Sequence, residues 1–346
     1  MTLEPSLRMK PWTTAWMKLI MRVRSLSRWW LVACVAAIGG VSPVAWAQSF
    51  PSRALEWVVP YPPGGGTDVV ARALAQAMSD RLGQQIVVLN KPGAATNIGA
   101  DYVARAKGDG YTLMSADTGT LAANPFLYSK LTYNAEKDFA PVGLTVRFPL
   151  ILVVHPQVPA KNLAELRAWA QSQKSVAYAS PGSGSPHHLA TELFKGLTQM
   201  DLMHVPYKGA APALQDVAGG QVPMMFVDTA AGQSFIASGK LRAIGVASPQ
   251  RLKTLETVPT LAEQGLRGFE AFAWQGLVVP TGTPADVVAT LNQALRAALE
   301  APAVKERLQA LGLESTPSTP AQMADYVRSE RAKWGAVIKA AGIQVD

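Results

Sequence analysis

Three consecutive glycines in the stretch YPPGGGTDVV, residues 61–70, form the segment of this chain best suited to binding a ligand. Glycine-rich turns between a strand and a helix let a ligand approach unpaired backbone N–H groups, and phosphate is a common occupant. Here Gly66 is followed by Thr67 and Asp68, whereas a P-loop needs lysine and then Ser or Thr after its last glycine. The spacing also differs from G-x-G-x-x-G, and Asp68 would repel a pyrophosphate. We therefore predict that this loop binds no nucleotide.

A second Gly/Ser-rich segment, SPGSGSPHH at residues 180–188, occupies the same kind of junction farther along the chain. Helix N-termini present free N–H groups and attract negative charge, so two opposed loops of this type could bind a small carboxylate between them. Ser180, Ser183 and Ser185 add hydroxyl donors. For the first loop alone, a tight turn without a ligand is an equally good interpretation.

Short apolar runs alternate with helical patterns along most of the chain, which predicts an α/β fold with mainly parallel sheets. Two series of elements each begin with a strand and a glycine-rich loop, and this favours two similar lobes. From residue 280 onward the pattern is mostly helical. If these late helices pack on the first lobe, the chain crosses between lobes near 147–151 and 270–276, as in a hinged clamshell.

The first 47 residues have the three parts of a secretory signal peptide: a basic segment, an apolar run over 29–44, and the small-x-small end Ala45-Trp46-Ala47. The basic segment is unusually long, and translation from Met21 would give a more ordinary length. The apolar run contains two glycines and a proline and is short for a membrane anchor. We expect cleavage after Ala47, a periplasmic protein, and no lipidation at Cys34.

Several function classes are disfavoured by composition and motifs. The chain has a formal net charge of +8, but beyond the leader it is only mildly basic and shows no Lys/Arg cluster, so nucleic-acid binding is not expected. Adjacent helical residues such as His187 and His188 point about 100° apart, which disfavours a metal site. The nucleophile elbow G-x-S-x-G of a secreted hydrolase does not occur. We expect neither an enzyme nor a cofactor.

Seven sequence blocks, in order, resemble the extracytoplasmic receptors of tripartite tricarboxylate transporters, the TctC or Bug family. The similarity covers the chain from Phe50 to Ile343. The blocks are VPYPPGGGTDVVAR (59–72), NKPGAATNIGADYVARAKGDGYTL (90–113), NPFLYSKLTYNAEKDFAPV (124–142), SPGSGSPHHLATELFK (180–195), HVPYKGAAPALQDVAGGQVPMMF (204–226), GKLRAIGVAS (239–248) and AFAWQGLVVPTGTP (271–284).

The resemblance implies a type II periplasmic-binding-protein clamshell, with lobe one at 50–148 plus 275–346 and lobe two at 149–274. It implies a monomer that binds a small carboxylate through main-chain groups, hydroxyls and water, and delivers it to a membrane permease. The ligand-binding candidates carried over from the family are Tyr61, Gly65, Gly66, Thr67, Asp68, Ser115, Asp117, Thr118, Ser180, Gly184, Ser185, His188, Asp228 and Thr229.

Two acidic residues among these candidates leave the ligand class open. Asp117 and Asp228 could favour a ligand that also carries an ammonium group, such as an amino acid, or each could simply cap a helix. Citrate-like acids, dicarboxylates, aromatic acids and nicotinate are further options. A receptor of this kind could also serve a membrane signalling partner rather than a permease.

Overall fold

The computed structural model describes residues 50–345, so the predicted leader, its cleavage site and Cys34 lie outside the described residues. Within this part of the chain the strands form one ten-stranded sheet system in which two groups of strands share a long central strand. The two groups are described in turn, because each positions one of the glycine-rich loops.

The first group is built on parallel strands that surround the GGG loop. Strand β1 (Leu55–Val59) pairs with β2 (Ile86–Asn90) on one side and with β3 (Thr112–Asp117) on the other, all parallel. Helices α2 (Gly66–Leu82) and α3 (Asn97–Ala104) form the crossovers, followed by the π-helical turn η2 (Thr118–Ala123) and α4 (Asn124–Leu127). The late helices are α9 (Ala285–Glu300), α10 (Pro302–Ala310) and α11 (Pro320–Ala341).

The second group repeats this plan around the second loop. Strand β5 (Val176–Ser180) pairs in parallel with β6 (Leu202–Pro206) and β7 (Met224–Asp228). Its helices are α5 (Leu163–Gln171), α6 (Pro186–Thr198), α7 (Ala210–Ala218) and α8 (Thr229–Ala237), and β8 (Arg242–Val246) completes the group. Helix α6 begins directly after the second glycine-rich loop, as α2 does after the first.

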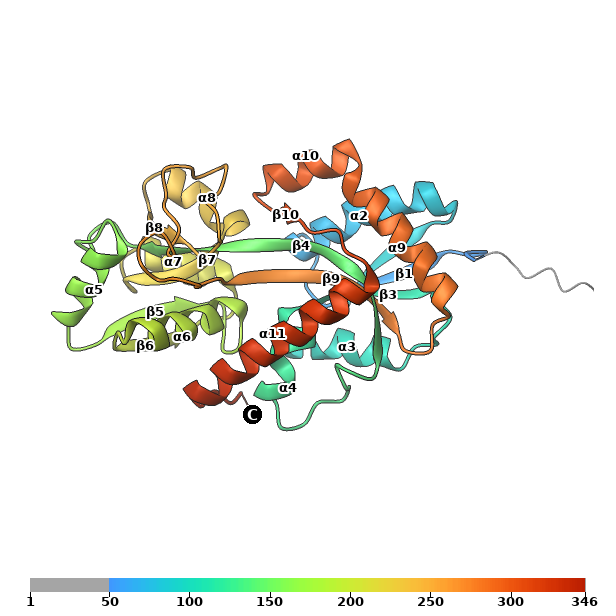
Figure 1. The fold of residues 1–346 in the computed structure, drawn as a ribbon, viewed down its shortest axis with the longest axis horizontal. Helices are drawn as coiled ribbons and strands as arrows, with labels where there is room; N and C mark the ends of the chain where they lie inside the picture. The colour runs from blue at the N-terminus through green and yellow to red at the C-terminus, as the bar shows by residue number, and fades with distance from the viewer. Residues whose placement is uncertain (1–49, 346) are drawn as a thin grey trace, which may run out of the picture. The chain divides into compact units, whose positions relative to one another are not determined.

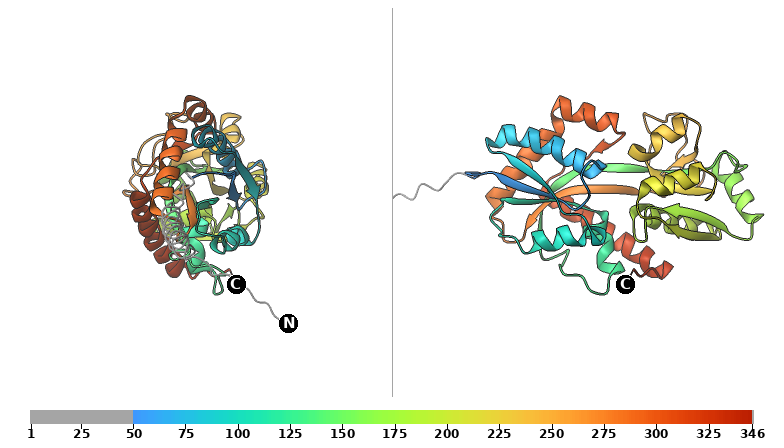
Figure 2. Two further views of the ribbon diagram at one scale, coloured as in Figure 1. Left: turned by 90° about the vertical axis from the view of Figure 1, so that its right-hand side faces the viewer. Right: turned by 180° about the vertical axis from the view of Figure 1, so that it is seen from behind.

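Two long antiparallel strands join the groups (Figures 1 and 2). Strand β4 (Phe139–Val154) pairs with β9 (Phe272–Pro280) along its first half, and then with β7 and β8 along its second half. The α/β fold class predicted from the sequence is confirmed. Strands β1, β2 and β3, and likewise β5, β6 and β7, pair in parallel, since helical crossovers connect them. Strands β4 and β9 carry the chain between the groups, and they run antiparallel to their neighbours.

The sequence around Pro149 predicts two shorter strands, over 140–146 and 150–154, and strand β4 differs from this prediction. The structure has one strand of 16 residues. Proline lacks the N–H of a sheet ladder, so it is expected at edges and irregular positions. Pro149 is the last residue of β4 that pairs with β9, opposite Phe272, and from Leu150 onward the partner is β7. The proline therefore lies where the strand changes partners.

The apolar core is shared between the two groups. One cluster lies beneath α2, α9 and α10, and another lies beneath α7 and α8. A third contains Met114 of β3, Trp274 of β9 and Phe194 of α6, all buried. Helix α11 packs against η2, β4 and α4 as well as α6, so it contacts elements of both groups (Figure 1).

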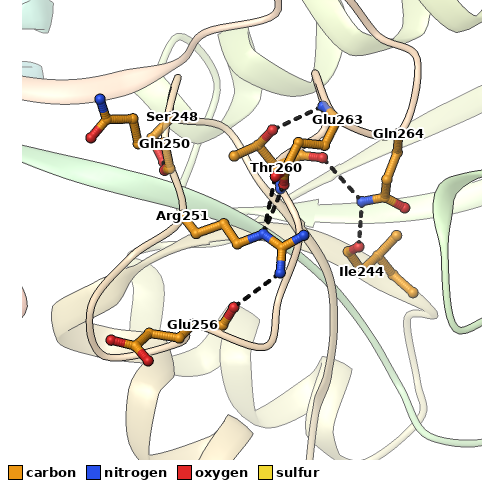
Figure 3. Close-up of polar contacts among 8 residues, drawn as sticks. All are labelled: Ile244, Ser248, Gln250, Arg251, Glu256, Thr260, Glu263 and Gln264. Carbon is orange, nitrogen blue, oxygen red and sulfur yellow. Dashed lines mark hydrogen bonds and ion pairs between the residues drawn. The ribbon is translucent and has the colours of Figure 1, made fainter.

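The connection between β8 and β9 contains no helix or named strand, but side-chain hydrogen bonds stabilise it (Figure 3). The Arg251 guanidinium pairs with Glu263, and Gln264 donates to the Ile244 carbonyl at 2.8 Å. Thr260 accepts a hydrogen bond from the Glu263 backbone N–H. In the described residues, no helix is both long enough and apolar enough to cross a membrane.

Candidate functional site

The two glycine-rich loops lie at the carboxyl ends of β1 and β5 and lead into the N-termini of α2 and α6. Each loop contains a glycine with positive φ, Gly64 at 84° and Gly184 at 76°, a conformation that other residues rarely adopt. The three glycines of the first loop are exposed, whereas Gly184 is buried. The backbone of the first loop is thus the more accessible of the two.

Asp68 braces the first loop from within helix α2. Its carboxylate accepts hydrogen bonds from the Gly64 N–H at 2.8 Å, the Arg72 Nε at 2.9 Å and the Asn90 Nδ2 at 2.8 Å. Burial acts to raise the pKa of this carboxyl, but the hydrogen bonds, led by that from Arg72, outweigh it and keep the pKa below its ordinary value. Both oxygens are engaged, so Asp68 stabilises the loop and its charge is already compensated.

The N-terminus of α2 itself is not capped by a side chain. Gly65 occupies the N-cap position in extended conformation and makes no side-chain hydrogen bond to the helix. The first turn of a helix has N–H groups without intrahelical partners. Because Gly65 and Gly66 are exposed, these N–H groups can reach a ligand. This is the arrangement that suits a bound anion.

In the second loop, His188 takes the place of the bracing carboxylate. Its Nδ1 accepts the Gly184 N–H at 3.0 Å, and its ring stacks on His204 with centroids 3.8 Å apart. His204 in turn lies 2.6 Å, Nε2 to Oγ, from Ser180. Burial lowers the pKa of His188 to about 4 and that of His204 to about 4, so both rings are neutral at pH 7.

The two loops therefore share a local geometry that the sequence did not reveal. In each, the N–H of a positive-φ glycine is accepted by the side chain four residues later, in the first turn of the helix. In this equivalence, Ser185 corresponds to Gly65, and Ser185 caps α6 by accepting the His188 N–H. His187 likewise corresponds to Thr67.

The predicted residues near the end of β3 mostly bond to their own surroundings. Ser115 accepts a hydrogen bond from the Trp57 indole at 2.8 Å, and Thr118 accepts the Trp274 N–H at 3.2 Å. Thr67 accepts from the amide of Gln275 at 2.6 Å. Gln275 lies directly opposite Asp117 in the sheet, so these polar groups gather beside the first loop.

Asp117 and Tyr61 form a hydrogen-bonded pair at the same place. The Tyr61 hydroxyl donates to the Asp117 carboxylate, whose other oxygen accepts the Thr120 N–H at 2.8 Å. Burial, followed by the charge of Asp117, raises the pKa of Tyr61 well above its ordinary value, so the hydroxyl remains a donor. Asp117 thus caps η2.

Asp228 also caps a helix, since its carboxylate accepts the Ala231 N–H at 2.9 Å at the start of α8. Its other oxygen lies 3.3 Å from the Nε2 of His187. Burial acts to raise the pKa of Asp228, but the hydrogen bond and charge of His187 outweigh it and lower the pKa. Next to it, Thr229 donates to the Gly312 carbonyl at 2.7 Å, a contact between α8 and the segment that follows α10.

Strand β4 brings parts of both groups close together. A Cβ on Gly66 would lie 3.3 Å from the ring of Phe148, and Leu150, two residues along, pairs with Asp228. A Cβ on Gly184 would lie 2.3 Å from Leu127 of α4, so the second loop packs against the first group. The first loop and the end of β7 therefore both lie beside β4, and the second loop lies beside α4.

Several residues of this region were not among the sequence candidates. Gln275 contacts Thr67, His187 contacts Asp228, and Asn90 contacts Asp68. The available signal for Gln275 was a polar residue within the apolar run FAWQGLVV. The sequence favours a core position for His204 over one that lines a cleft, and its stacking against His188 connects that position to the second loop.

Two strand groups of this kind, joined by long shared strands and with helix N-termini at the strand ends, define the fold of the periplasmic binding proteins. Residues 70–343 match the tripartite tricarboxylate transporter family receptor, TctC. The chain belongs to this family of solute receptors, whose members are periplasmic and are not enzymes.

Individual relatives agree with this assignment. BugT of Bordetella pertussis is 36% identical over 313 residues, which cover 90% of this chain and 96% of BugT. The structure of Rpa4515 from R. palustris with adipate superposes with a TM-score of 0.78 at 35% identity, covering 86% of this chain and all of that one. MatC from Rhodopseudomonas palustris with bound malate gives a TM-score of 0.73 at 36% identity, over 84% of this chain and all of MatC.

Proposed function

We propose that this protein binds a small dicarboxylate between two lobes, residues 50–148 plus 275–346 and residues 149–274, and delivers it to the permease of a tripartite tricarboxylate transporter. The observation that carries the proposal is the N-terminus of α2, which has no side-chain cap and is preceded by exposed glycines. A carboxylate there would accept backbone N–H groups that have no intrahelical partner. Asp68 keeps the loop in shape without competing for these donors.

The ligand class follows from the environment and from relatives. Asp117 and Asp228 both accept hydrogen bonds as helix caps, so neither is a free carboxylate that would require an ammonium group. Relatives of about one third identity have been solved with adipate and with malate. Dicarboxylates of four to six carbons are therefore the first candidates, ahead of amino acids.

Closure of the lobes would complete the site. In this proposal the acid binds first to the α2 N-terminus, and polar groups of the second lobe beside the α6 N-terminus complete its contacts on closing. A ligand drives closure only by its greater affinity for the closed state. The receptor is exported after cleavage following Ala47, acts as a monomer, and presents its closed face to the permease.

The test is a thermal-shift and calorimetric titration of the protein purified from the periplasm of an expression host. It would be unfolded, dialysed and refolded first to remove any carried ligand, and the released material would be analysed by mass spectrometry. Saturable stabilisation by succinate, malate or adipate, but not by their diamides, is expected because native-state binding stabilises by mass action. Stabilisation only by amines, sugars or nucleotides would overturn the proposal.

A variant at Gly65 tests the place of binding. Its backbone is in an ordinary extended conformation, and a Cβ would have Pro62 O at 3.7 Å as its nearest neighbour, so Gly65→Val should fold. The branched side chain would block access to the α2 N–H groups and lower dicarboxylate affinity by at least about 100-fold, the loss of two charge-assisted hydrogen bonds. A folded variant with unchanged affinity would exclude this loop as the site. N-terminal sequencing of the same sample tests cleavage after Ala47.

A further inference from the structure

His187 lies in the first turn of α6, between the N-termini of two helices. It is 8% exposed, and its Nε2 is 3.3 Å from the carboxylate of Asp228, the N-cap of α8. In the local equivalence of the two loops it takes the position of Thr67, a candidate ligand-binding residue of the first lobe. The ring therefore occupies the place in the second loop that corresponds to a binding position in the first.

The other ring nitrogen of His187 has no partner. Nδ1 is inaccessible to solvent and makes no hydrogen bond, one of three such side-chain atoms in the described residues. Buried polar atoms in folded proteins are nearly always hydrogen-bonded, so each exception calls for an explanation. The other two are on Glu56 of β1 and on Ser315 of the short strand β10 (Glu314–Ser315). The unpartnered nitrogen at the α6 N-terminus thus points to a missing hydrogen-bonding group.

The contact with Asp228 decides which proton His187 carries. An ionised carboxylate only accepts hydrogen bonds, so the Nε2 facing it must bear a hydrogen. Nδ1 is then either a bare acceptor or, in the imidazolium, a second donor. A carboxylate ligand needs the donor, and the imidazolium would lie between two negative groups, Asp228 and the ligand.

We infer that His187 is a specificity-determining residue of the second lobe, whose imidazolium donates its Nδ1–H to one carboxylate of the bound dicarboxylate while Asp228 orients the ring from the opposite side. This inference rests on the proposed function. It assigns one carboxylate to the α2 N-terminus and the other to His187, so the receptor requires two acidic groups. A monoacid of equal length would leave the His187 nitrogen unpaired.

The charged groups around α6 agree with this assignment. Among the described residues, the ionisable side chain that is hydrogen-bonded to His187 is Asp228, at the end of β7. On the β5–β6 side, Tyr178 and His204 stack with His188 instead. Strand β9 has no ionisable residue. The ion pairs of α11 that the structure shows go to Asp325, Glu330 and Glu136, and on α6 itself Lys195 pairs with Glu192.

Two substitutions separate a ligand contact from a structural role. In His187→Gln, the amide reaches the position of Nε2 and can still donate to Asp228, but nothing replaces Nδ1. In His187→Asn, the shorter amide replaces Nδ1 and loses the contact with Asp228. We expect the Gln variant to bind adipate or malate 10- to 100-fold more weakly than wild type, and the Asn variant to lose less than the Gln variant. His155→Gln, at a strand end where Nδ1 already accepts the Gln157 N–H, is the matched control and should bind as wild type.

The reverse order, with Gln close to wild type and Asn weak, would show that His187 only orients Asp228 and would overturn the inference. Equal binding by wild type and both variants would also overturn it. A wild-type protein that binds no dicarboxylate would instead reject the proposed function.

Discussion

The two glycine-rich loops of this protein have the same local geometry, but the side chain that accepts the glycine N–H is charged in the first loop and neutral in the second. In the first, the brace is the carboxylate of Asp68, which is compensated by Arg72 and Asn90. In the second, the brace is the neutral ring of His188, which stacks on His204. Both accept the N–H of a positive-φ glycine four residues earlier. The geometry is therefore a requirement of the strand-to-helix turn, whereas the accepting group is set by its surroundings.

The surroundings explain why the braces differ. A carboxylate at position 188 would be buried against the rings of Tyr178 and His204, and burying a charge that is not hydrogen-bonded to a partner is costly. A neutral imidazole at position 68 would leave Arg72 without its partner. The difference has a functional side as well, because the glycines of the first loop are exposed and its helix is uncapped, whereas Gly184 of the second loop is buried and Ser185 caps its helix.

The largest effect is expected from removing the charged brace. Asp68→Ala removes the acceptor of three hydrogen bonds, which come from Gly64, Arg72 and Asn90. The substitution should lower the free energy of unfolding by about 2–4 kcal/mol. Urea denaturation followed by circular dichroism measures it. Asp101→Ala is the matched control, since Asp101 also pairs with an arginine four residues later but on the surface, and should cost about 1 kcal/mol or less. Equal losses in the two variants would show that Asp68 does not brace the loop.

The neutral brace predicts a pH dependence that the charged brace does not share. His188 and His204 have a pKa of about 4 in the folded protein, below the value of about 6.5 in an unfolded chain. The unfolded chain therefore binds more protons between these values, so stability falls as pH drops from 6.5 to 4, by about 2–3 kcal/mol for each histidine. The pKa of Asp68 is lowered instead, so its contribution is lost only below its unfolded value of about 3.9.

Thermal unfolding between pH 7.5 and 4 tests this difference. The double variant His188→Asn/His204→Phe retains an acceptor at the position of Nδ1 for the Gly184 N–H and an aromatic ring at position 204, but it removes both titrating groups. It should flatten the dependence between pH 6.5 and 4. A slope identical to wild type would assign the pH dependence to other residues.

A smaller effect is expected at the helix cap that only the second loop has. Ser185→Ala removes the acceptor of the His188 N–H and should lower the free energy of unfolding by about 1 kcal/mol. Ser183, an exposed residue of the same loop, provides the control, and Ser183→Ala should change it by less than about 0.5 kcal/mol. Indistinguishable variants would mean that Ser185 contributes no cap.

The smallest effect is expected from a substitution that gives the first loop the kind of helix cap that the second loop has. Gly65→Ser introduces a side chain at the N-cap of α2, where none exists, and should raise the free energy of unfolding by a few tenths of a kcal/mol. The same hydroxyl would occupy N–H groups that the ligand needs, so dicarboxylate affinity should fall several-fold. Calorimetric titration alongside urea denaturation measures both quantities. A variant that gains affinity would show that the uncapped N-terminus is not the binding surface.

Much of the fold was predictable because its elements follow local rules. Apolar spacing together with flanking proline and glycine predicts a helix over 320–341 and a strand over 176–180, and the structure has both elements with these bounds. Both glycine-rich loops were also located from the sequence at strand-to-helix junctions. The lobe boundaries and the assignment of ligand-binding residues remain predictions, to be tested as described above.

The sequence by itself determined the order of strands and helices and the positions of the loops, because these depend on residues near one another in the chain. The tertiary structure decided which side chains brace the loops and which remain available. Asn90 reaches Asp68 from 22 residues away, and Gln275 reaches Thr67 from the far end of the chain. Such contacts depend on sheet register and burial, which no local pattern encodes. For the same reason, no sequence pattern indicated that the Nδ1 of His187 would be buried without a hydrogen-bond partner.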